Sequence, residues 1–123
     1  MLEATCHCGA VRIEIDELPA ALTDCNCSVC SRYSALWCHL TRATARIHSA
    51  PGIVSAYLCN DEVIEFYHCR KCGCVTHYES IDKAPDQRIA INFNMFPAKD
   101  IGAIEIRYFD GADSWKFFEK ELT

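Results

Sequence analysis

One short stretch of the chain contains three cysteines within six positions, in the order Cys-x-Cys-x-x-Cys, at Cys25, Cys27 and Cys30. Side chains alternate along an extended strand, so Cys25 and Cys27 point to the same face, and a tight turn or first helical turn brings Cys30 back toward them. Three converging thiolates favour a soft metal ion, most commonly zinc. Because structural zinc sites have four protein ligands and catalytic sites have three, the cluster predicts an open zinc site, provided that no other side chain closes it.

Four more cysteines form two close pairs, one Cys-x-Cys and one Cys-x-x-Cys, each followed by a glycine: Cys6 with Cys8, and Cys69 with Cys72. Together the two pairs supply the four ligands of a closed zinc site. The spacing also allows Cys25 and Cys27 to join the second pair, which would leave the first pair partly free. The division into four and three ligands is favoured because structural sites are usually closed.

A framework of disulfides is the alternative explanation for ten cysteines in 123 residues. Such frameworks are typical of small secreted domains that lack a large core. Here half of the residues are hydrophobic, and the N-terminal residues have neither the basic nor the apolar region of a signal peptide. Members of a Cys-x-Cys pair are also poorly placed to bridge each other. We therefore expect one metal-binding domain over residues 1–123, located in the cytoplasm.

Charge and hydropathy weigh against two other classes, nucleic-acid-binding proteins and membrane-spanning proteins. The formal net charge is -5, and the basic residues are scattered rather than gathered into the patch that a nucleic-acid-binding protein needs. The chain has no apolar run long enough to span a membrane. We therefore expect neither nucleic acid nor membrane as a partner, whereas exposed strand edges would allow a homodimer.

Short runs of alternating or β-branched residues, separated by turn residues, predict an all-β domain with little helix. One helical turn is predicted over residues 31–35. The predicted extended segments follow in chain order: residues 10–16, 20–23, 36–41, 45–48, 53–58, 62–68, 74–78, 88–93 and 103–108.

Several other residues could take part in chemistry but are more typical of the core or of strands. Two isolated cysteines are expected to be buried: Cys38 and Cys59. Cys74 is close enough to the second pair to be a substitute ligand, although a core or strand position is favoured. Of the five histidines, His77 is the one that could close a metal site. Three aromatic residues could line a pocket or fill the core: Tyr33, Trp37 and Phe93.

The cysteine motifs resemble those of the glutathione-dependent formaldehyde-activating enzyme family, which includes proteins of the centromere protein V type. The resemblance rests on four segments: Cys-His-Cys-Gly at 6–9, Cys-Asn-Cys-Ser-Val-Cys at 25–30, Cys-Arg-Lys-Cys-Gly at 69–73 and Arg-Tyr-Phe-Asp-Gly-Ala-Asp-Ser-Trp at 107–115. It implies an Mss4-like fold, a β-tent of several short antiparallel strands. It also implies two zinc ions, a structural one on Cys6, Cys8, Cys69 and Cys72 and a catalytic one on Cys25, Cys27 and Cys30.

The same resemblance implies a carbon–sulfur lyase that acts on a thiol such as glutathione and a small aldehyde such as formaldehyde, like S-hydroxymethylglutathione synthase. Three thiolates leave a zinc site formally negative, so we infer that it suits an incoming thiol better than a carbonyl and would hold that thiol as thiolate. Arg32 is the best placed cation for the negative charge of glutathione. The alternative is a zinc-stabilised binding module without catalysis, which would follow if a protein side chain fills the fourth position.

Overall fold

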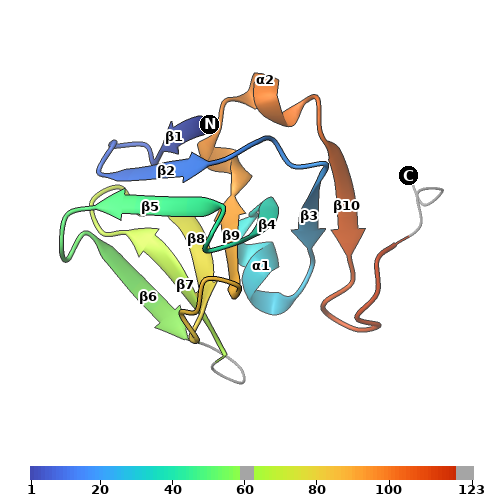
Figure 1. Ribbon diagram of the computed structural model, residues 1–123. Helices are drawn as coiled ribbons and strands as arrows, with labels where there is room; N and C mark the ends of the chain where they lie inside the picture. Colours follow the sequence, from blue (N-terminus) through green and yellow to red (C-terminus); the bar gives the residue numbers. More distant parts are fainter. Residues whose placement is uncertain (59–62, 119–123) are drawn as a thin grey trace.

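The computed structural model describes residues 1–58 and 63–118. Cys59 and the link between the strands around it lie outside the described residues. The described part is mostly β, as predicted, and Figure 1 shows its arrangement. Its elements are β1 (Leu2–Thr5), β2 (Val11–Ile15), β3 (Ala21–Cys25), α1 (Ser28–Tyr33), β4 (Trp37–Thr41), β5 (Ala45–Ser49), β6 (Val54–Leu58), β7 (Ile64–Cys69), β8 (Val75–Ser80), β9 (Arg88–Asn92), a 3₁₀ turn (Phe93–Met95), α2 (Ala98–Ile101) and β10 (Glu105–Phe109).

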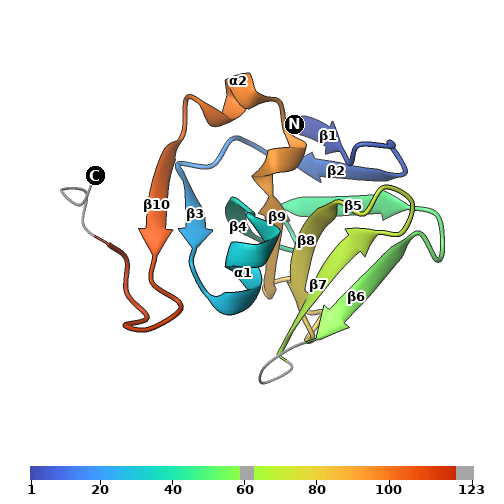
Figure 2. The same cartoon turned by 180° about the vertical axis from the view of Figure 1, so that it is seen from behind.

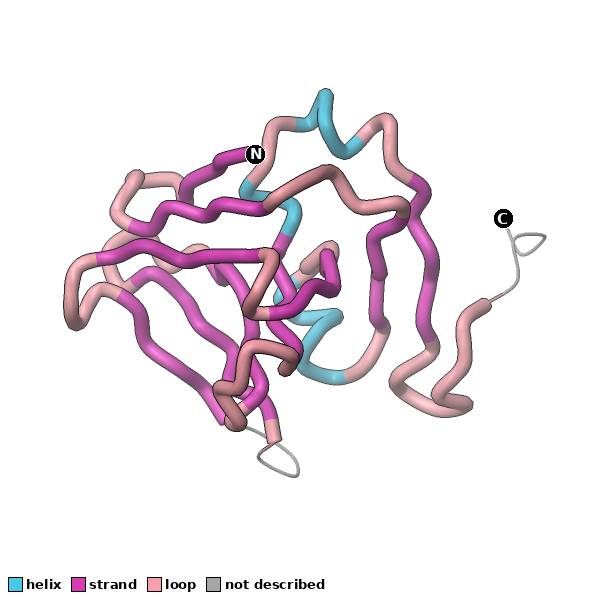
Figure 3. The backbone as a smooth tube through the Cα atoms, viewed as in Figure 1, coloured by secondary structure: helices cyan, strands magenta, loops and turns pink. Residues whose placement is uncertain are grey.

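The strands form two sheets, traced as a tube in Figure 3. The small sheet has the order β1-β2-β5, and the large sheet has the order β10-β3-β4-β9-β8-β7-β6. Neighbouring strands are antiparallel except for β10, which pairs with β3 in parallel. Figure 2 shows that β3 and β10 lie on one side of the molecule, with the small sheet and the β6–β8 strands on the other.

Burial follows the alternation that predicted the strands. In β2, Val11, Ile13 and Ile15 are fully buried, while Arg12 between the first two is exposed. Ile13 and Ile15 share one hydrophobic cluster with Ile91 of β9, so the main core lies between the two sheets. Burial of one such aliphatic side chain stabilises the fold by about 1.5–3 kcal/mol relative to an exposed position.

The structure corrects the predicted helical turn over residues 31–35. Helix α1 begins at Ser28 and therefore includes Cys30. The reason is that Cys27 caps the helix: its sulfur accepts a hydrogen bond from the backbone N–H of Cys30 at 3.4 Å. Strand β1, the 3₁₀ turn, α2 and the parallel pairing of β10 were not predicted. Within the described residues no helix is long and apolar enough to cross a membrane.

Candidate metal centres

Four cysteine sulfurs from the two sheets converge on one point. Cys6 and Cys8 come from the β1–β2 turn, and Cys69 and Cys72 from the β7–β8 turn; their sulfurs all lie within 4.8 Å of one another. The Cys8 sulfur is 3.7 Å from that of Cys6 and 3.6 Å from that of Cys69. Zinc–sulfur bonds of about 2.3 Å in a tetrahedron place sulfurs about 3.8 Å apart, whereas a disulfide requires about 2.05 Å. This four-sulfur cluster therefore has the spacing of a metal site.

Two similar turns present these sulfurs. Each turn contains a glycine in the left-handed region, Gly9 with φ 82° and Gly73 with φ 81°. The Gly9 N–H donates to the Cys6 carbonyl at 3.1 Å, and the Gly73 N–H donates to the Cys69 carbonyl at 2.9 Å. Glycine adopts this conformation without the steric cost that a side chain brings. The backbone thus turns sharply enough for both sulfurs of each pair to face the same point.

Backbone donors prepare the four-sulfur cluster for a cation. The N–H groups of Cys74 and Cys8 point at the Cys72 sulfur and lower the pKa of its thiol to about 5. A thiol with so low a pKa is a thiolate at neutral pH, which is the form that binds metal. Cys6 and Cys69 are buried, whereas Cys8 is exposed, so the cluster has one edge toward solvent. A thiolate at Cys72 favours a soft cation such as zinc.

The second cluster is built where β3 leads into α1. Cys25 ends β3, Cys27 caps α1 and Cys30 lies in its first turn, and the three sulfurs lie within 4.8 Å of one another. Among the described residues no fourth cysteine, histidine or carboxylate joins this three-sulfur cluster. Cys30 is buried, whereas Cys25 and Cys27 are half-buried, so a ligand would approach from the side of Cys25 and Cys27.

Trp37 supports the buried side of the three-sulfur cluster. Its indole Nε1–H donates to the Cys30 sulfur at 3.3 Å, and its side chain is 1% exposed. The indole packs against Tyr78 at 4.9 Å and Phe66 at 6.0 Å between ring centroids. Burial raises the pKa of Cys30, and the hydrogen bond from Trp37 opposes that rise. Of the predicted alternatives for Trp37, the structure therefore supports a core residue, one that also contacts a candidate ligand.

The environment of the Cys27 thiol favours a negative charge more than that of the Cys30 thiol does. Burial acts to raise its pKa, but hydrogen bonds from the backbone N–H of Cys30, from the thiols of Cys30 and Cys25 and from the backbone N–H of Val29 together outweigh burial, and the pKa falls below its usual value. The start of α1 thus favours a thiolate at this position, since the first N–H groups of a helix have no partner within the helix.

A C-terminal loop contacts the three-sulfur cluster through Asn26. The Asn26 side chain donates to Asp110 at 3.1 Å and accepts from the backbone N–H of Ala112 at 3.0 Å. Asp110 also accepts from the backbone N–H of Ser114 at 3.1 Å and from its hydroxyl at 2.9 Å. The sequence pattern did not predict this contact with the cysteines. The position of Asn26 between two cysteines was the signal that could have pointed to this contact.

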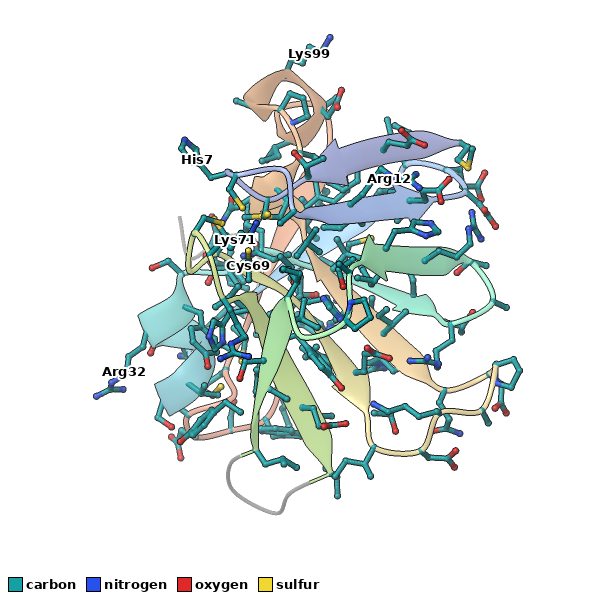
Figure 4. The ribbon with its side chains drawn as sticks, turned by 90° about the vertical axis from the view of Figure 1, so that its left-hand side faces the viewer. His7, Arg12, Arg32, Cys69, Lys71 and Lys99 are labelled. Carbon is teal, nitrogen blue, oxygen red and sulfur yellow. The ribbon has the colours of Figure 1, made fainter. Side chains whose placement is uncertain are left out.

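Arg32 extends from α1 away from the rest of the protein, as Figure 4 shows. Its guanidinium donates to the carbonyl of Ser28 at 2.8 Å, and the residue is exposed. Figure 4 also shows Cys69 and Lys71 on the turn that faces the loop of His7. The structure thus places Arg32 on the same helix as Cys30, with its charged end directed to solvent.

Two of the remaining cysteines lie within the described residues, Cys38 and Cys74. Cys38 is fully buried in the main core, as predicted. Cys74 is half-buried and packs beside the four-sulfur cluster without belonging to it. Its backbone carbonyl accepts from the Cys69 N–H at 2.9 Å, a contact that helps to close the β7–β8 turn. Phe93 is also fully buried, whereas Tyr33 packs against Phe66 at 5.5 Å on the side of the three-sulfur cluster.

His77 has partners for both ring nitrogens and is not a candidate ligand. Nδ1 lies 2.8 Å from the hydroxyl of Thr76, and Nε2 lies 3.2 Å from the carboxylate of Glu79. The side chain is 1% exposed, and burial lowers its pKa to about 3, with the charges of Lys83 and Arg42 acting in the same direction. A neutral imidazole that donates to Glu79 and accepts from Thr76 satisfies these contacts.

The fold and the two clusters together define a mostly β protein whose thiols are arranged as zinc ligands are. The family model of the glutathione-dependent formaldehyde-activating enzyme matches residues 1–108, and the chain belongs to this family. The chain is similar to a Rhodobacter sphaeroides protein whose crystal structure was determined as a structural genomics target. The two share 25% sequence identity with a TM-score of 0.69, over 85% of this chain and 99% of that one. Comparison with curated proteins gives no match.

Proposed function

We propose that this protein is a zinc-dependent carbon–sulfur lyase that joins a thiol, such as glutathione, to a small aldehyde, such as formaldehyde. The observation that carries the proposal is the three-sulfur cluster, which lacks a fourth protein ligand among the described residues and has one solvent-facing side. Catalytic zinc sites characteristically keep one position open. Membership of a family named for activating formaldehyde with glutathione supports the same reaction.

The two clusters are proposed to hold different zinc ions. The closed set would be structural and consists of Cys6, Cys8, Cys69 and Cys72. The open set would be catalytic and consists of Cys25, Cys27 and Cys30. Zinc in the open set would supply a binding position for the sulfur of the thiol and would favour its thiolate form near neutral pH. Soft thiolate donors in both sets suit this metal.

The chain's own residues would position the reactants. The indole N–H of Trp37 holds the Cys30 sulfur at 3.3 Å and so fixes the inner side of the three-sulfur cluster. Arg32 is proposed to bind a carboxylate of the thiol, which requires its exposed side chain to leave the carbonyl of Ser28. The reduced thiols needed for this reaction are maintained in the cytoplasm, which is the compartment that we propose.

Exchange spectroscopy with ¹³C-formaldehyde and glutathione tests the proposal. The zinc-loaded protein should accelerate formation of the hemithioacetal beyond the spontaneous rate. Cys27→Ala should abolish the acceleration because the variant removes one ligand of the open set. Cys38→Ala is the matched control, since Cys38 lies in the main core and belongs to neither cluster. A Cys27→Ala variant that retains the full acceleration would contradict the assignment of the site.

A zinc-stabilised binding module is the second candidate function. The observation that favours it is the exposed position of Arg32, whose guanidinium donates to the carbonyl of Ser28 and is directed to solvent. The same experiment separates the two functions. A binding module would bind glutathione at the three-sulfur cluster without accelerating the reaction.

A further inference from the structure

The C-terminal loop of residues 109–115 lies directly against the open side of the three-sulfur cluster. A Cβ atom added to Gly111 would lie 2.7 Å from the Cys25 sulfur and 3.1 Å from the Cβ of Cys27. Gly111 does not have a positive φ, so its backbone conformation is open to other residues. The requirement for glycine is therefore one of space: any side chain here would press on the candidate ligands.

The loop is held in this position by hydrogen bonds rather than by apolar packing alone. The Asn26 backbone N–H donates to the Phe109 carbonyl at 3.2 Å, in addition to the two side-chain contacts of Asn26 described above. Asn26 lies between two candidate ligands, so the loop and the cluster are positioned by the same residue. Parallel pairing of β10 with β3 brings Phe109 opposite Cys25 and so delivers the loop to this point.

Trp115 lies beside Gly111 on the same side of the cluster. Its ring atom Cζ3 would be 3.5 Å from a Cβ on Gly111, so the indole lies beside the same space as the Cys25 sulfur. The indole contacts Phe109 edge-to-face at 5.1 Å, yet the residue remains 69% exposed. It also has a φ of 61°, a conformation that non-glycine residues rarely adopt. A strained and exposed aromatic residue next to a candidate metal site points to a functional contact.

We propose that Trp115 binds the planar amide groups of the thiol substrate. This inference rests on the proposed function. Trp37 covers the cluster on the side of Cys30, and Gly111 packs against Cys25, so a thiol would approach beside the loop at the half-buried Cys27. There its carbon atoms would meet the indole of Trp115. A peptide-like thiol such as glutathione offers amide planes for that face, whereas a minimal thiol offers none. The family model ends at residue 108, before this loop.

Cobalt(II) in place of zinc makes thiol binding visible in the full-length protein, since sulfur coordination produces charge-transfer absorption. Glutathione and 2-mercaptoethanol are titrated into the wild-type protein and into Trp115→Ala, Trp115→Phe and Phe117→Ala. Phe117 is the matched control because it is an exposed aromatic residue of the same segment that packs against Phe109 and under Arg107. The four-sulfur cluster is already closed, so its cobalt should not respond.

Trp115→Ala should weaken glutathione binding by about fivefold to tenfold, the size of one aromatic contact, and change 2-mercaptoethanol binding by less than about twofold. Trp115→Phe should retain most of the affinity, and Phe117→Ala should match the wild type. Unchanged glutathione affinity in Trp115→Ala would overturn the inference and leave the proposed function intact. Equal weakening of both thiols would also overturn it, because the indole would then act on the cluster rather than on the substrate. If neither thiol alters the wild-type spectrum, the proposed function itself fails.

Discussion

At the scale of single residues, we expect the contact between Trp37 and Cys30 to affect how tightly the three-sulfur cluster binds a metal. The indole N–H donates to the Cys30 sulfur at 3.3 Å. Donors of this kind orient a metal ligand and tune its charge. The contact joins a residue of β4 to one of α1, and it is buried from solvent.

Trp37→Phe should weaken metal binding at the three-sulfur cluster by about tenfold, because it removes the donor and keeps an aromatic side chain in the core. Phe66→Leu is the control, since Phe66 packs in the same aromatic cluster and has no hydrogen bond to a sulfur. Titration with a competing chelator measures the affinity of each site. Equal losses in the two variants would show that packing, rather than the hydrogen bond, sets the affinity.

The cysteines could be predicted from the sequence, whereas Trp37 and Gly111 could not. Cys25, Cys27 and Cys30 are close in the chain, so local geometry alone brings their sulfurs together. The contact of Gly111 with Cys25 depends instead on where β10 pairs in the sheet, which no local pattern specifies. Trp37 had two possible roles in the sequence, and only the packing of α1 on β4 distinguishes them.

At the scale of elements, the two glycine turns determine how the four-sulfur cluster is presented. Gly73 has a φ of 81° and no atom within 4 Å of an added Cβ, so its requirement for glycine is conformational. Gly102, by contrast, ends α2 with a φ of -62° and has only ordinary contacts around an added Cβ. Substituting each of these two glycines by alanine therefore separates the effect of backbone conformation from the effect of adding a side chain.

Gly73→Ala should therefore lower the free energy of unfolding by about 1 kcal/mol, because a left-handed conformation costs an alanine about 1–2 kcal/mol. Gly102→Ala should be neutral or slightly stabilising, since alanine reduces the freedom of the unfolded chain at a compatible position. Urea denaturation of the zinc-loaded variants measures both values. Equal stabilities of the two variants would contradict the role assigned to the turn.

The alternation of apolar and polar residues located strands of the sheets but not the start of α1. Alternating residues located β2, where Val11 and Ile13 are buried on either side of the exposed Arg12, whereas β9 is buried on both faces from residue 89 to residue 92. The start of α1 was misplaced because Cys27 was considered only as a ligand and not as a helix cap. The sulfur of Cys27 caps the helix and lies in the three-sulfur cluster, so the helix begins between two of the candidate ligands.

At the scale of the whole molecule, the four-sulfur cluster links the two sheets. Cys8 of the β1–β2 turn and Cys69 at the end of β7 are 61 positions apart in the chain, and their sulfurs are 3.6 Å apart. A metal held by both turns would close a long loop and so stabilise the fold by constraining the unfolded chain. The three-sulfur cluster spans only six positions at the β3–α1 junction, so its loss should leave the link between the sheets in place.

The zinc-to-protein ratio of the anaerobically purified chain tests the central claim most directly. The wild type should contain two zinc ions per chain by mass spectrometry, in accordance with the two clusters. Cys27→Ala should contain about one and keep its fold by circular dichroism, because the four-sulfur cluster is complete without Cys27. A wild-type protein with a single zinc that survives Cys27→Ala would contradict the claim that the three-sulfur cluster is a metal site.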